Sequence, residues 1–375
     1  MEVTIVNKLE ALIQELCPNG VEFKSIKEEY QRLKGTPITA GKMKEIQSDN
    51  GDIRIFAGGK TVIDAHEKDI PNANITRVPA VLVQSRGVID AVYCERPFTF
   101  KNEMWAYTHN EKTSVKYLYY ILKNNMGKFR EVASGMGSLP QISLKVTENF
   151  VMPLPPLPVQ REIVRILDSF TELTSELTSE LTSREKQYEH YRDRLLSIEG
   201  NQWTTLGDKQ LFNFHYGKGN TIPKATGHYP VYGCNGIVGS TNIYNCENVP
   251  IVGHIGSAGI VNWGAGKIFV TYNGTICDVV DSNIVSTKFL FYYLQSANLP
   301  QYVKGSQPFL SVSDFEKVRF PIISIQEQKR IVDILDCFDA LCNDLMSGLP
   351  AEIKARQKQY EYYRDKLLSF KEKNI

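Results

Sequence analysis

The stretch VMPLPPLPVQREIVRILDSFTEL, residues 151–173, has a second copy in this chain. That copy is RFPIISIQEQKRIVDILDCFDAL, residues 319–341. Each copy is followed by a nearly identical segment, KQYEHYRDRLLS at 186–197 and KQYEYYRDKLLS at 358–369. A repeat of this length indicates two copies of one structural unit. We therefore expect a tandem duplication with an internal pseudo-twofold repeat.

The similarity extends into the segments that precede each helical copy. These segments contain short runs rich in Val, Ile, Tyr and Phe that are bounded by Gly, Asn and Pro, a pattern typical of strands joined by tight turns. One YLYYIL-type helix is expected in each. We predict an α+β fold with two domains built on twisted, mainly antiparallel sheets, each followed by a long helical region. The matched pairs are 20–26 with 200–206, 53–59 with 229–235, 117–122 with 289–294, and 136–144 with 304–312.

Apolar residues in the helical copies alternate at spacings of four and three, which predicts a coiled-coil seam. In the second copy we expect a break near Gly348–Leu349 and a new helix from Pro350 to about Phe370. Proline inside a helix costs about 3 kcal/mol, but it fits the first helical position. The seam residues are Ile163, Leu167, Phe170, Leu177, Leu181, Ile331, Leu335, Phe338 and Leu345.

Within the first helix, residues 171–183 read TELTSELTSELTS, a four-residue repeat. Each unit adds about 6 Å of helix. One interpretation is an ordinary amphipathic helix surface. The other is a spacer that sets the length between the two globular domains.

Composition excludes a strongly basic, tail-type binder, because 43 basic residues face 42 acidic ones. Residues 1–152 carry 20 basic and 18 acidic side chains, and residues 198–320 carry 8 and 7. Local basic loops remain compatible with this balance. The seven cysteines lack CxxC spacing, which favours reduced intracellular thiols. With neither a signal-peptide pattern nor a long apolar run, we expect a cytoplasmic, soluble protein.

Motifs for catalysis are missing from the sequence. An adenine methyltransferase needs an Asn/Asp-Pro-Pro-aromatic loop, and the chain has no such tetrapeptide. Gly59-Lys60-Thr61 resembles the end of a P-loop, but Arg54 occupies the first glycine position. The six histidines lack metal-ligand spacing. We expect no catalytic residues, no metal site and no cofactor of its own.

The pattern PLPPLxxQ-x-x-IV-x-IL-D-x-F, the TSEL repeat and KQYEYYRDKLLS together resemble the specificity subunit of type I restriction–modification systems. ELCPNGVEFKSI at 15–26 and LPAEIKARQKQYEYYRDKLLSF at 349–370 also resemble that family. The resemblance covers essentially the whole chain, although the globular segments match only weakly.

The resemblance implies two target-recognition domains, each reading one half of a bipartite, asymmetric DNA site. It implies that the helices form an antiparallel coiled coil that separates the domains and docks two methyltransferase subunits. Restriction and translocase subunits would bind through these. S-adenosylmethionine, ATP and Mg are expected on the partners, which would methylate adenine and cleave DNA. The expected parts are an N-terminal helical arm (1–19), recognition domain 1 (20–152), a central helix (153–199), recognition domain 2 (200–320) and C-terminal helices (321–375).

Candidate DNA-contacting residues are polar side chains in or beside glycine-containing loops, where bidentate contacts to base edges are possible. For any one of them, a solvated turn residue is the alternative. As a group they are more informative, because matched loops hold different side chains: Arg86 is aligned with Ala258, and Gln141 with Phe309. The candidates are Lys60, Ser85, Arg86, Lys101, Asn102, Ser138 and Gln141 in the first domain, and Lys218, Asn235, His254, Ser257, Tyr272, Asn273, Lys304, Ser306 and Gln307 in the second.

Three other functions stay open at this point. One is the specificity subunit of a two-gene system whose partner fuses nuclease and methylase. Another is a coiled-coil scaffold with no role in DNA binding. The third is a nuclease or transferase whose site has no recognised motif.

Overall fold

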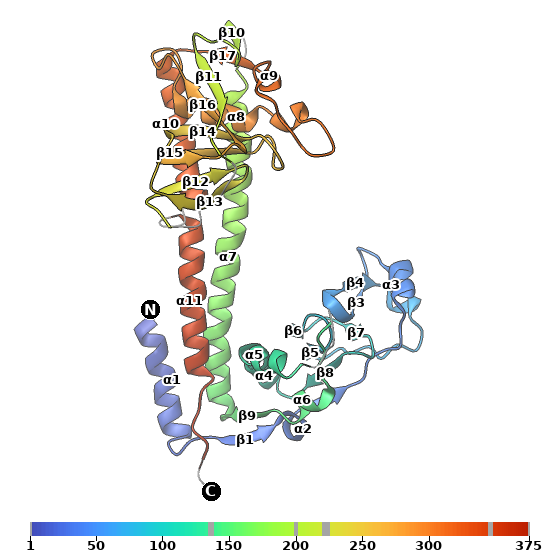
Figure 1. Cartoon of the computed structure of the whole chain (residues 1–375). Helices are drawn as coiled ribbons and strands as arrows, with labels where there is room; N and C mark the ends of the chain where they lie inside the picture. The colour runs from blue at the N-terminus through green and yellow to red at the C-terminus, as the bar shows by residue number, and fades with distance from the viewer. Residues whose placement is uncertain (1, 134–138, 199–201, 220–225, 344–347, 374–375) are drawn as a thin grey trace. The chain divides into compact units, whose positions relative to one another are not determined.

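The chain is described by a computed structural model that covers residues 2–133, 139–198, 202–219, 226–343 and 348–373. It forms two compact units (Figure 1). The first contains Met1–Glu176 together with Lys354–Ile375, and the second contains Leu177–Ile353. The units are therefore not the two halves of the sequence, because the boundary between them passes through two long helices.

In the first unit the strands form a four-stranded sheet and a three-stranded sheet. The four-stranded sheet has the order β2-β8-β5-β6 and is antiparallel throughout. The three-stranded sheet has the order β4-β3-β7, and its β3–β7 pair is parallel. The strands are β2 Gln31–Leu33, β3 Ile53–Phe56, β4 Val62–Ala65, β5 Ala80–Gln84, β6 Asp90–Cys94, β7 Phe98–Phe100 and β8 Trp105–Thr108.

The second unit repeats this arrangement as one six-stranded sheet, in the order β11-β16-β14-β15-β12-β13. Its β12–β15 pair is parallel and its other pairs are antiparallel. These sheets confirm the predicted α+β class. The strands are β11 Phe212–Tyr216, β12 Tyr229–Gly233, β13 Gly236–Thr241, β14 Cys246–Gly253, β15 Val261–Val270 and β16 Gly274–Val279.

A proline explains why the first unit has two sheets where the second has one. The long strand β15 corresponds to β6 and β7 together, because β6 pairs with β5 as β15 pairs with β14, and β7 pairs with β3 as β15 pairs with β12. Between β6 and β7 lies Pro97. Proline has no N–H to donate to a sheet ladder, so it interrupts the strand.

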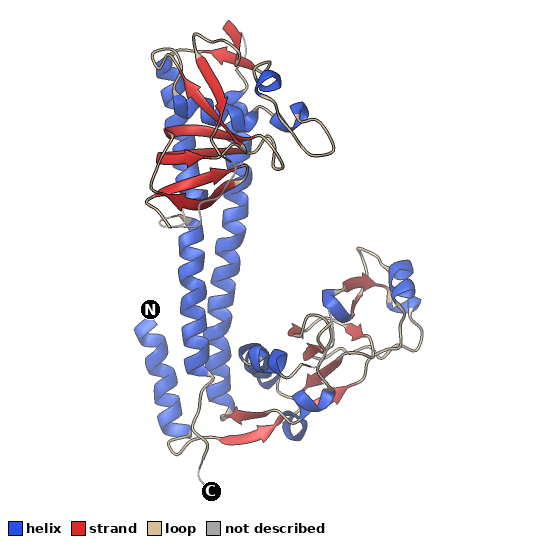
Figure 2. Cartoon of the chain, viewed as in Figure 1, coloured by secondary structure: helices blue, strands red, loops and turns tan. Residues whose placement is uncertain are grey.

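In each unit a two-stranded antiparallel sheet, formed by strands far apart in the sequence, connects the larger sheets to the helical framework. In the first unit β1 Glu22–Ser25 pairs with β9 Val151–Leu154, and in the second β10 Gln202–Thr205 pairs with β17 Arg319–Ile322. Figure 2 distinguishes the strands and helices of both units. The remaining elements are α1 Glu2–Leu16, α2 Ile26–Glu29, α3 Ala40–Ile46, η1 Gly58–Lys60, η2 Glu67–Asp69, α4 Lys112–Asn124, α5 Met126–Glu131, α6 Leu144–Glu148, α7 Leu157–Leu196, α8 Thr287–Ser296, η3 Leu299–Tyr302, α9 Val312–Phe315, α10 Ile325–Asn343 and α11 Leu349–Leu367.

The duplicated helical motif fixes the sheets of each unit to a helix of that unit. In α7, Gln160 is buried and accepts from Ser114 Oγ at 2.9 Å, and Asp168 accepts from Tyr120 at 2.5 Å. Lys116 lies 2.8 Å from the Asp168 carboxylate. Burial and the hydrogen bond to Asp168 raise the pKa of the Tyr120 hydroxyl, so it stays a donor.

The second copy makes contacts at equivalent positions, although its glutamine accepts from a backbone N–H instead of a hydroxyl. In α10, Gln328 is fully buried and accepts from the backbone N–H of Ser286 at 2.8 Å. Asp336 accepts from Tyr292 and lies 3.3 Å from Lys288 Nζ. The repeated Gln and Asp therefore have the same structural role in both units. They bind α4 in the first unit, and α8 in the second, to the framework helix.

The helical copies also exchange partners between repeats. In the first unit Phe170 of α7 stacks on Tyr363 of α11, with ring centroids 5.5 Å apart. In the second unit Phe338 of α10 stacks on Tyr191 of α7, with centroids 5.6 Å apart. Phe170 and Phe338 are equivalent in the repeat, as are Tyr191 and Tyr363. Each unit therefore joins the first part of one helical copy to the last part of the other.

Several of the predicted seam residues pack into domain cores rather than only against another helix. Ile163 and Leu167 are fully buried in a core that also contains residues of β5, β8 and α4, and Ile331 and Leu335 belong to the corresponding core of the second unit. Leu177 and Leu181 are only half-buried. Leu345 lies outside the described residues. The first two positions of each seam are thus part of a domain core.

The TSEL repeat is helical throughout, and its threonines bond to their own helix. Thr171 donates to Leu167 O at 2.9 Å, and Thr182 donates to Thr178 O at 3.1 Å. This i to i−4 bonding satisfies the hydroxyls within the helix. In the part of the chain that the structure describes, no helix is both long and apolar enough to cross a membrane.

Candidate nucleic-acid interface

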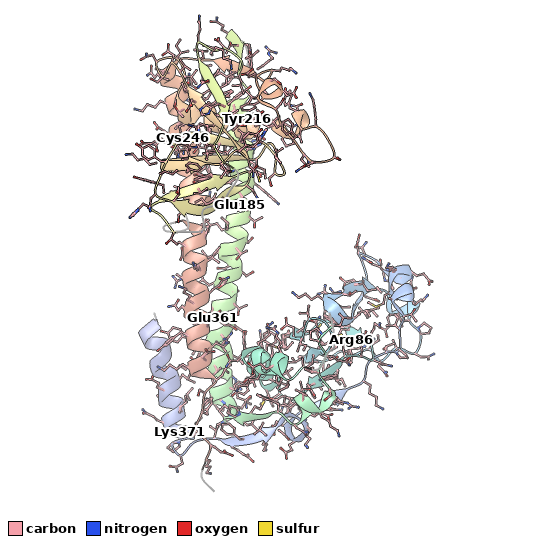
Figure 3. All side chains as sticks on the ribbon, in the orientation of Figure 1. Arg86, Glu185, Tyr216, Cys246, Glu361 and Lys371 are labelled. Atoms are coloured by element: carbon pink, nitrogen blue, oxygen red, sulfur yellow. The ribbon has the colours of Figure 1, made fainter. Side chains whose placement is uncertain are left out.

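In the first unit the predicted polar residues converge at one end of the sheets. The loop after β5 pairs with the segment before α6: Gly87 N–H donates to Pro140 O at 2.9 Å, and Ile142 N–H donates to Ser85 O at 2.9 Å. This places Arg86 opposite Gln141 in a short antiparallel bridge. Arg86, labelled in Figure 3, is exposed.

Two further loops reach the same place. A Cβ added at Gly87, where φ is +75°, would lie 3.9 Å from the Cα of Gly59, and one added at Gly58 would lie 3.8 Å from Glu103. Lys60 ends the turn that contains both of the other glycines. The positive φ explains why glycine occurs at 87.

Cations dominate this first cluster. Lys101 is paired with Glu103 at 3.0 Å. Among the described residues, no carboxylate lies within ion-pair distance of Lys34, Lys60 or Arg86. Unpaired Lys and Arg beside Asn102 and Gln141 suit phosphate contacts and base-edge hydrogen bonds.

In the second unit the corresponding loops converge through the same backbone bonds. Gly256 N–H donates to Pro308 O at 3.0 Å, and Leu310 N–H donates to His254 O at 3.0 Å. Lys304 and Phe309 exchange backbone bonds of 2.9 and 3.1 Å, which closes a hairpin with Ser306 and Gln307 exposed at its tip.

The remaining candidates flank this hairpin. Tyr272 N–H donates to Gly219 O at 2.9 Å, which brings the loop of Lys218 beside Tyr272 and Asn273. A Cβ at Gly256 would lie 3.9 Å from Cys234 Sγ, so Asn235 is in the adjacent turn. Ser257 lies in the turn between β14 and β15 and is half-buried.

Aromatic rings form the centre of the second cluster. His254 is fully buried, and its ring centroid lies 4.0 Å from that of Tyr216, 5.3 Å from Tyr272 and 4.7 Å from Phe309. Its Nδ1 lies 3.0 Å from Leu310 O, so this nitrogen donates. Tyr216, labelled in Figure 3, accepts from Val312 N–H at 3.2 Å.

Two similar loop clusters, each on a repeated sheet and helix, invite comparison with known proteins. The family model for the type I restriction modification DNA specificity domain matches residues 20–184 and again 201–355. The chain belongs to this family. It therefore carries two DNA specificity domains and acts in DNA sequence recognition.

Individual relatives agree with the family. The chain is 35% identical over 297 residues to the specificity subunit of the type I restriction enzyme EcoR124I/EcoR124II of Escherichia coli, covering 70% of this chain and 72% of that one. Its fold matches the crystal structure of a type I restriction-modification system S subunit from M. genitalium, with a TM-score of 0.67, 18% identity and coverage of 93% and 96%. A structure from a study of complex assembly and conformational transition of the type I R-M system matches with a TM-score of 0.57, 16% identity and coverage of 94% and 98%.

The structure corrects two sequence-based predictions for the specificity domains. Ser85 and His254 are buried, with 1% and 0% of their surface exposed. Ser85 Oγ donates to Glu103 O at 2.5 Å, and His254 supports the rings around it. Their side chains therefore shape the loops and do not face outward in this structure. Ser138 lies outside the described residues.

The alignment of Arg86 with Ala258 is also wrong. Arg86 lies between the two bonds that pair its loop with Pro140 and Ile142, and the residue between the equivalent bonds in the second domain is Ile255. Arg86 and Ile255 are 169 residues apart, whereas Arg86 and Ala258 are 172 apart, which is the offset of the helical segments 117–122 and 289–294. The segment between this loop and that helix is longer in the second domain, so one offset does not fit both. Gln141 and Phe309 are equivalent, as predicted.

Sequence reasoning missed Lys34 and Tyr216 as members of the clusters. Each precedes a glycine that packs on the last residue of the neighbouring strand: Gly35 on Phe100 O and Gly217 on Val270 O. The signal was the glycine that follows both residues. Within the described ranges, no group of three or more His, Cys, Asp or Glu side chains could hold a metal ion.

Proposed function

We propose that the two loop clusters each read one half of a bipartite, asymmetric DNA site. The observation that carries this proposal is the contrast between framework and loops. The framework contacts of Gln160 and Asp168 recur at Gln328 and Asp336. The loops keep their backbone bonds and change their side chains. A shared framework with different loop side chains is what two domains need in order to read two different half-sites.

In this proposal the helices dock two methyltransferase subunits, and the restriction and translocase subunits bind through them. One similar structure comes from a study of assembly of the type I R-M system, which supports partners of this kind. Adenine methylation and DNA cleavage then belong to the partners, which bind S-adenosylmethionine, ATP and Mg. The chain itself is a non-catalytic subunit. The two-gene system with a fused partner is the alternative, and the identity of the neighbouring genes decides between them.

Methylome sequencing tests the proposal directly. Cells that carry this chain with its cognate methyltransferase should show methylated adenine in a motif with two defined parts and an undefined gap. Arg86→Ala should relax or weaken recognition in one part, and the equivalent Ile255→Ala should affect the other part. A single continuous motif, or equal damage to both parts by each variant, would contradict the proposal.

The TSEL repeat provides a second test. Removal of one four-residue unit from α7 shortens that helix by about 6 Å, which corresponds to at most about two base pairs at a rise of about 3.4 Å. Both half-sites should be unchanged and the gap between them shorter. Full activity with an unchanged gap would favour the ordinary helix surface over the spacer.

A further inference from the structure

At equivalent positions, the loop cluster of the first domain holds polar side chains and that of the second domain holds aromatic or aliphatic ones. The backbone bonds define the equivalence. The bridge pairs Arg86 with Gln141 in one domain and Ile255 with Phe309 in the other. Ser85 and His254 precede the bridged residues in their loops and accept equivalent bonds.

Two more pairs follow from the neighbouring strands. Lys101 N–H donates to Phe56 O, and Thr271 N–H donates to Tyr232 O, each at 2.9 Å, so the next residues, Asn102 and Tyr272, are equivalent. Lys34 and Tyr216 are equivalent because each precedes a glycine on the same strand end. At all five positions the first domain has a polar residue, and the second has an aromatic or aliphatic one. The pairs are Lys34 and Tyr216, Ser85 and His254, Arg86 and Ile255, Asn102 and Tyr272, and Gln141 and Phe309.

The aromatic side chains of the second domain form a braced surface. His254 is fully buried and contacts all three rings, so it holds them in place from beneath. Tyr272 and Phe309 nevertheless leave 39% and 38% of their surface exposed. Exposed rings fixed on a buried support lose little side-chain entropy on binding, because their rotamers are already restricted.

Positive charge borders these rings. Lys218 is exposed in the loop whose Gly219 carbonyl accepts from Tyr272. Lys304 flanks Phe309 and lies 2.7 Å from Asp314, with two thirds of its side chain exposed. Cations around an apolar centre suit a ligand with a phosphate backbone and an apolar feature inside it.

We propose that the second domain recognises thymine through its C5-methyl group, with Ile255, Tyr272 and Phe309 as the contacting side chains. The proposal rests on the proposed function. In the major groove, thymine alone presents a methyl group, and apolar side chains read it by contact. The first domain, with Arg86, Asn102 and Gln141 in place of these residues, reads its half-site through hydrogen bonds and charge instead.

The experiment changes the DNA and leaves the protein intact. After the motif is known, the wild-type chain with its methyltransferase is bound to duplexes in which each thymine is replaced in turn by deoxyuridine. This replacement removes only the methyl group. At one or more thymines of a single half-site, we expect affinity to fall about fourfold, the equivalent of about 0.8 kcal/mol per methyl group. Thymines of the other half-site should tolerate the change.

Two variants show which domain causes the sensitivity to deoxyuridine. Phe309→Ala should bind more weakly and lose its sensitivity to deoxyuridine, whereas the equivalent Gln141→Ala should keep it. The inference is overturned if deoxyuridine has no effect in either half-site, if both half-sites respond alike, or if Phe309→Ala keeps full sensitivity. If the rings instead insert between base pairs, deoxyuridine should have no effect in either half-site, which would overturn the inference.

The experiment also separates this inference from the proposed function. If the complex does not prefer its motif to a scrambled duplex, the proposed function itself is wrong. If it prefers the motif but ignores the methyl groups, only the thymine inference is wrong.

Discussion

Gln328 offers the sharpest test of how a recognition domain is fixed to its helix. The side chain is fully buried in α10. Its Nε2 donates to Ile284 O at 2.7 Å and to Ile323 O at 3.0 Å, and its Oε1 accepts from Ser286 N–H at 2.8 Å. These bonds tie α10 to the start of α8 and to the end of β17, so Gln328→Ala removes three connections at once.

The expected cost follows from these contacts. Each hydrogen bond contributes about 1 kcal/mol net, and each buried partner left without a bond costs about 1–3 kcal/mol. We expect Gln328→Ala to lower the free energy of unfolding of the second unit by about 3–5 kcal/mol. Against a typical total of about 5–15 kcal/mol, this loss is large.

Urea unfolding and hydrogen-exchange mass spectrometry measure the effect. Peptides that cover residues 284–296 and 323–338 should exchange faster, while peptides of the first unit keep their protection. The equivalent Gln160 has a bond to Ser114 Oγ at 2.9 Å and one to Pro155 O at 2.8 Å, so Gln160→Ala should cost less and affect the first unit. Gln326→Ala, at an exposed position of the same helix, should change stability by less than about 0.5 kcal/mol.

Two outcomes would refute this reasoning. One is a loss of less than about 1 kcal/mol, which would mean that water or a small shift replaces the three bonds. The other is faster exchange in both units alike, which would mean that Gln328 does not act within its own unit.

The remaining predictions concern the helices and one loop. Phe170→Ala and Phe338→Ala should each cost about 2–3 kcal/mol in urea unfolding, because equivalent rings stack at 5.5 and 5.6 Å; a neutral result for one alone would show that the repeats are not equivalent. Gly256→Ala should reduce DNA affinity and lower the free energy of unfolding by about 1–2 kcal/mol, because alanine is strained at a φ of +80°. Gly127→Ala, where an added Cβ meets no atom within 4 Å, is its control. Lys304, then Lys317 and Ser311, hold the pKa of Asp314 well below its usual range. Such a carboxylate stabilises the fold above the unfolded pKa of about 3.9, and the gain is lost as pH falls further. The difference in urea midpoint between wild type and Asp314→Asn should therefore be constant from pH 8 to 5 and shrink below pH 4.

Much of the framework was predictable because residues that recur in the sequence make equivalent contacts in both units. Gln160, Asp168 and their second copies recur because the same contacts recur. The helix α11 begins at Leu349, one residue before the predicted start at Pro350. These features depend on local spacing, which a single sequence displays.

Other features depend on partners that local spacing does not reveal. An apolar stripe has the same period whether it faces a helix or a sheet, so the burial of Ile163 and Leu167 in a domain core was not predicted. The exchange of helical partners between repeats, as in Phe170 with Tyr363, joins residues far apart in the chain. The segment between the Arg86 loop and the following helix differs in length from its counterpart in the second domain, which shifted the alignment of Arg86. In each case the missing information was tertiary.

The composition of the first unit has a consequence for synthesis of the protein. That unit needs Lys354–Ile375, and Val21 exchanges backbone hydrogen bonds of 2.9 Å with Lys371 and Lys373. At about 5–20 residues per second, the ribosome needs roughly 10–35 s to translate the intervening Leu177–Ile353. The domain made first is thus completed last, whereas the continuous second unit has all of its residues before the C-terminal part of α11 and the tail after it emerge. During that interval the first domain exposes the apolar surface that the final helix covers, and it is the natural client for a chaperone.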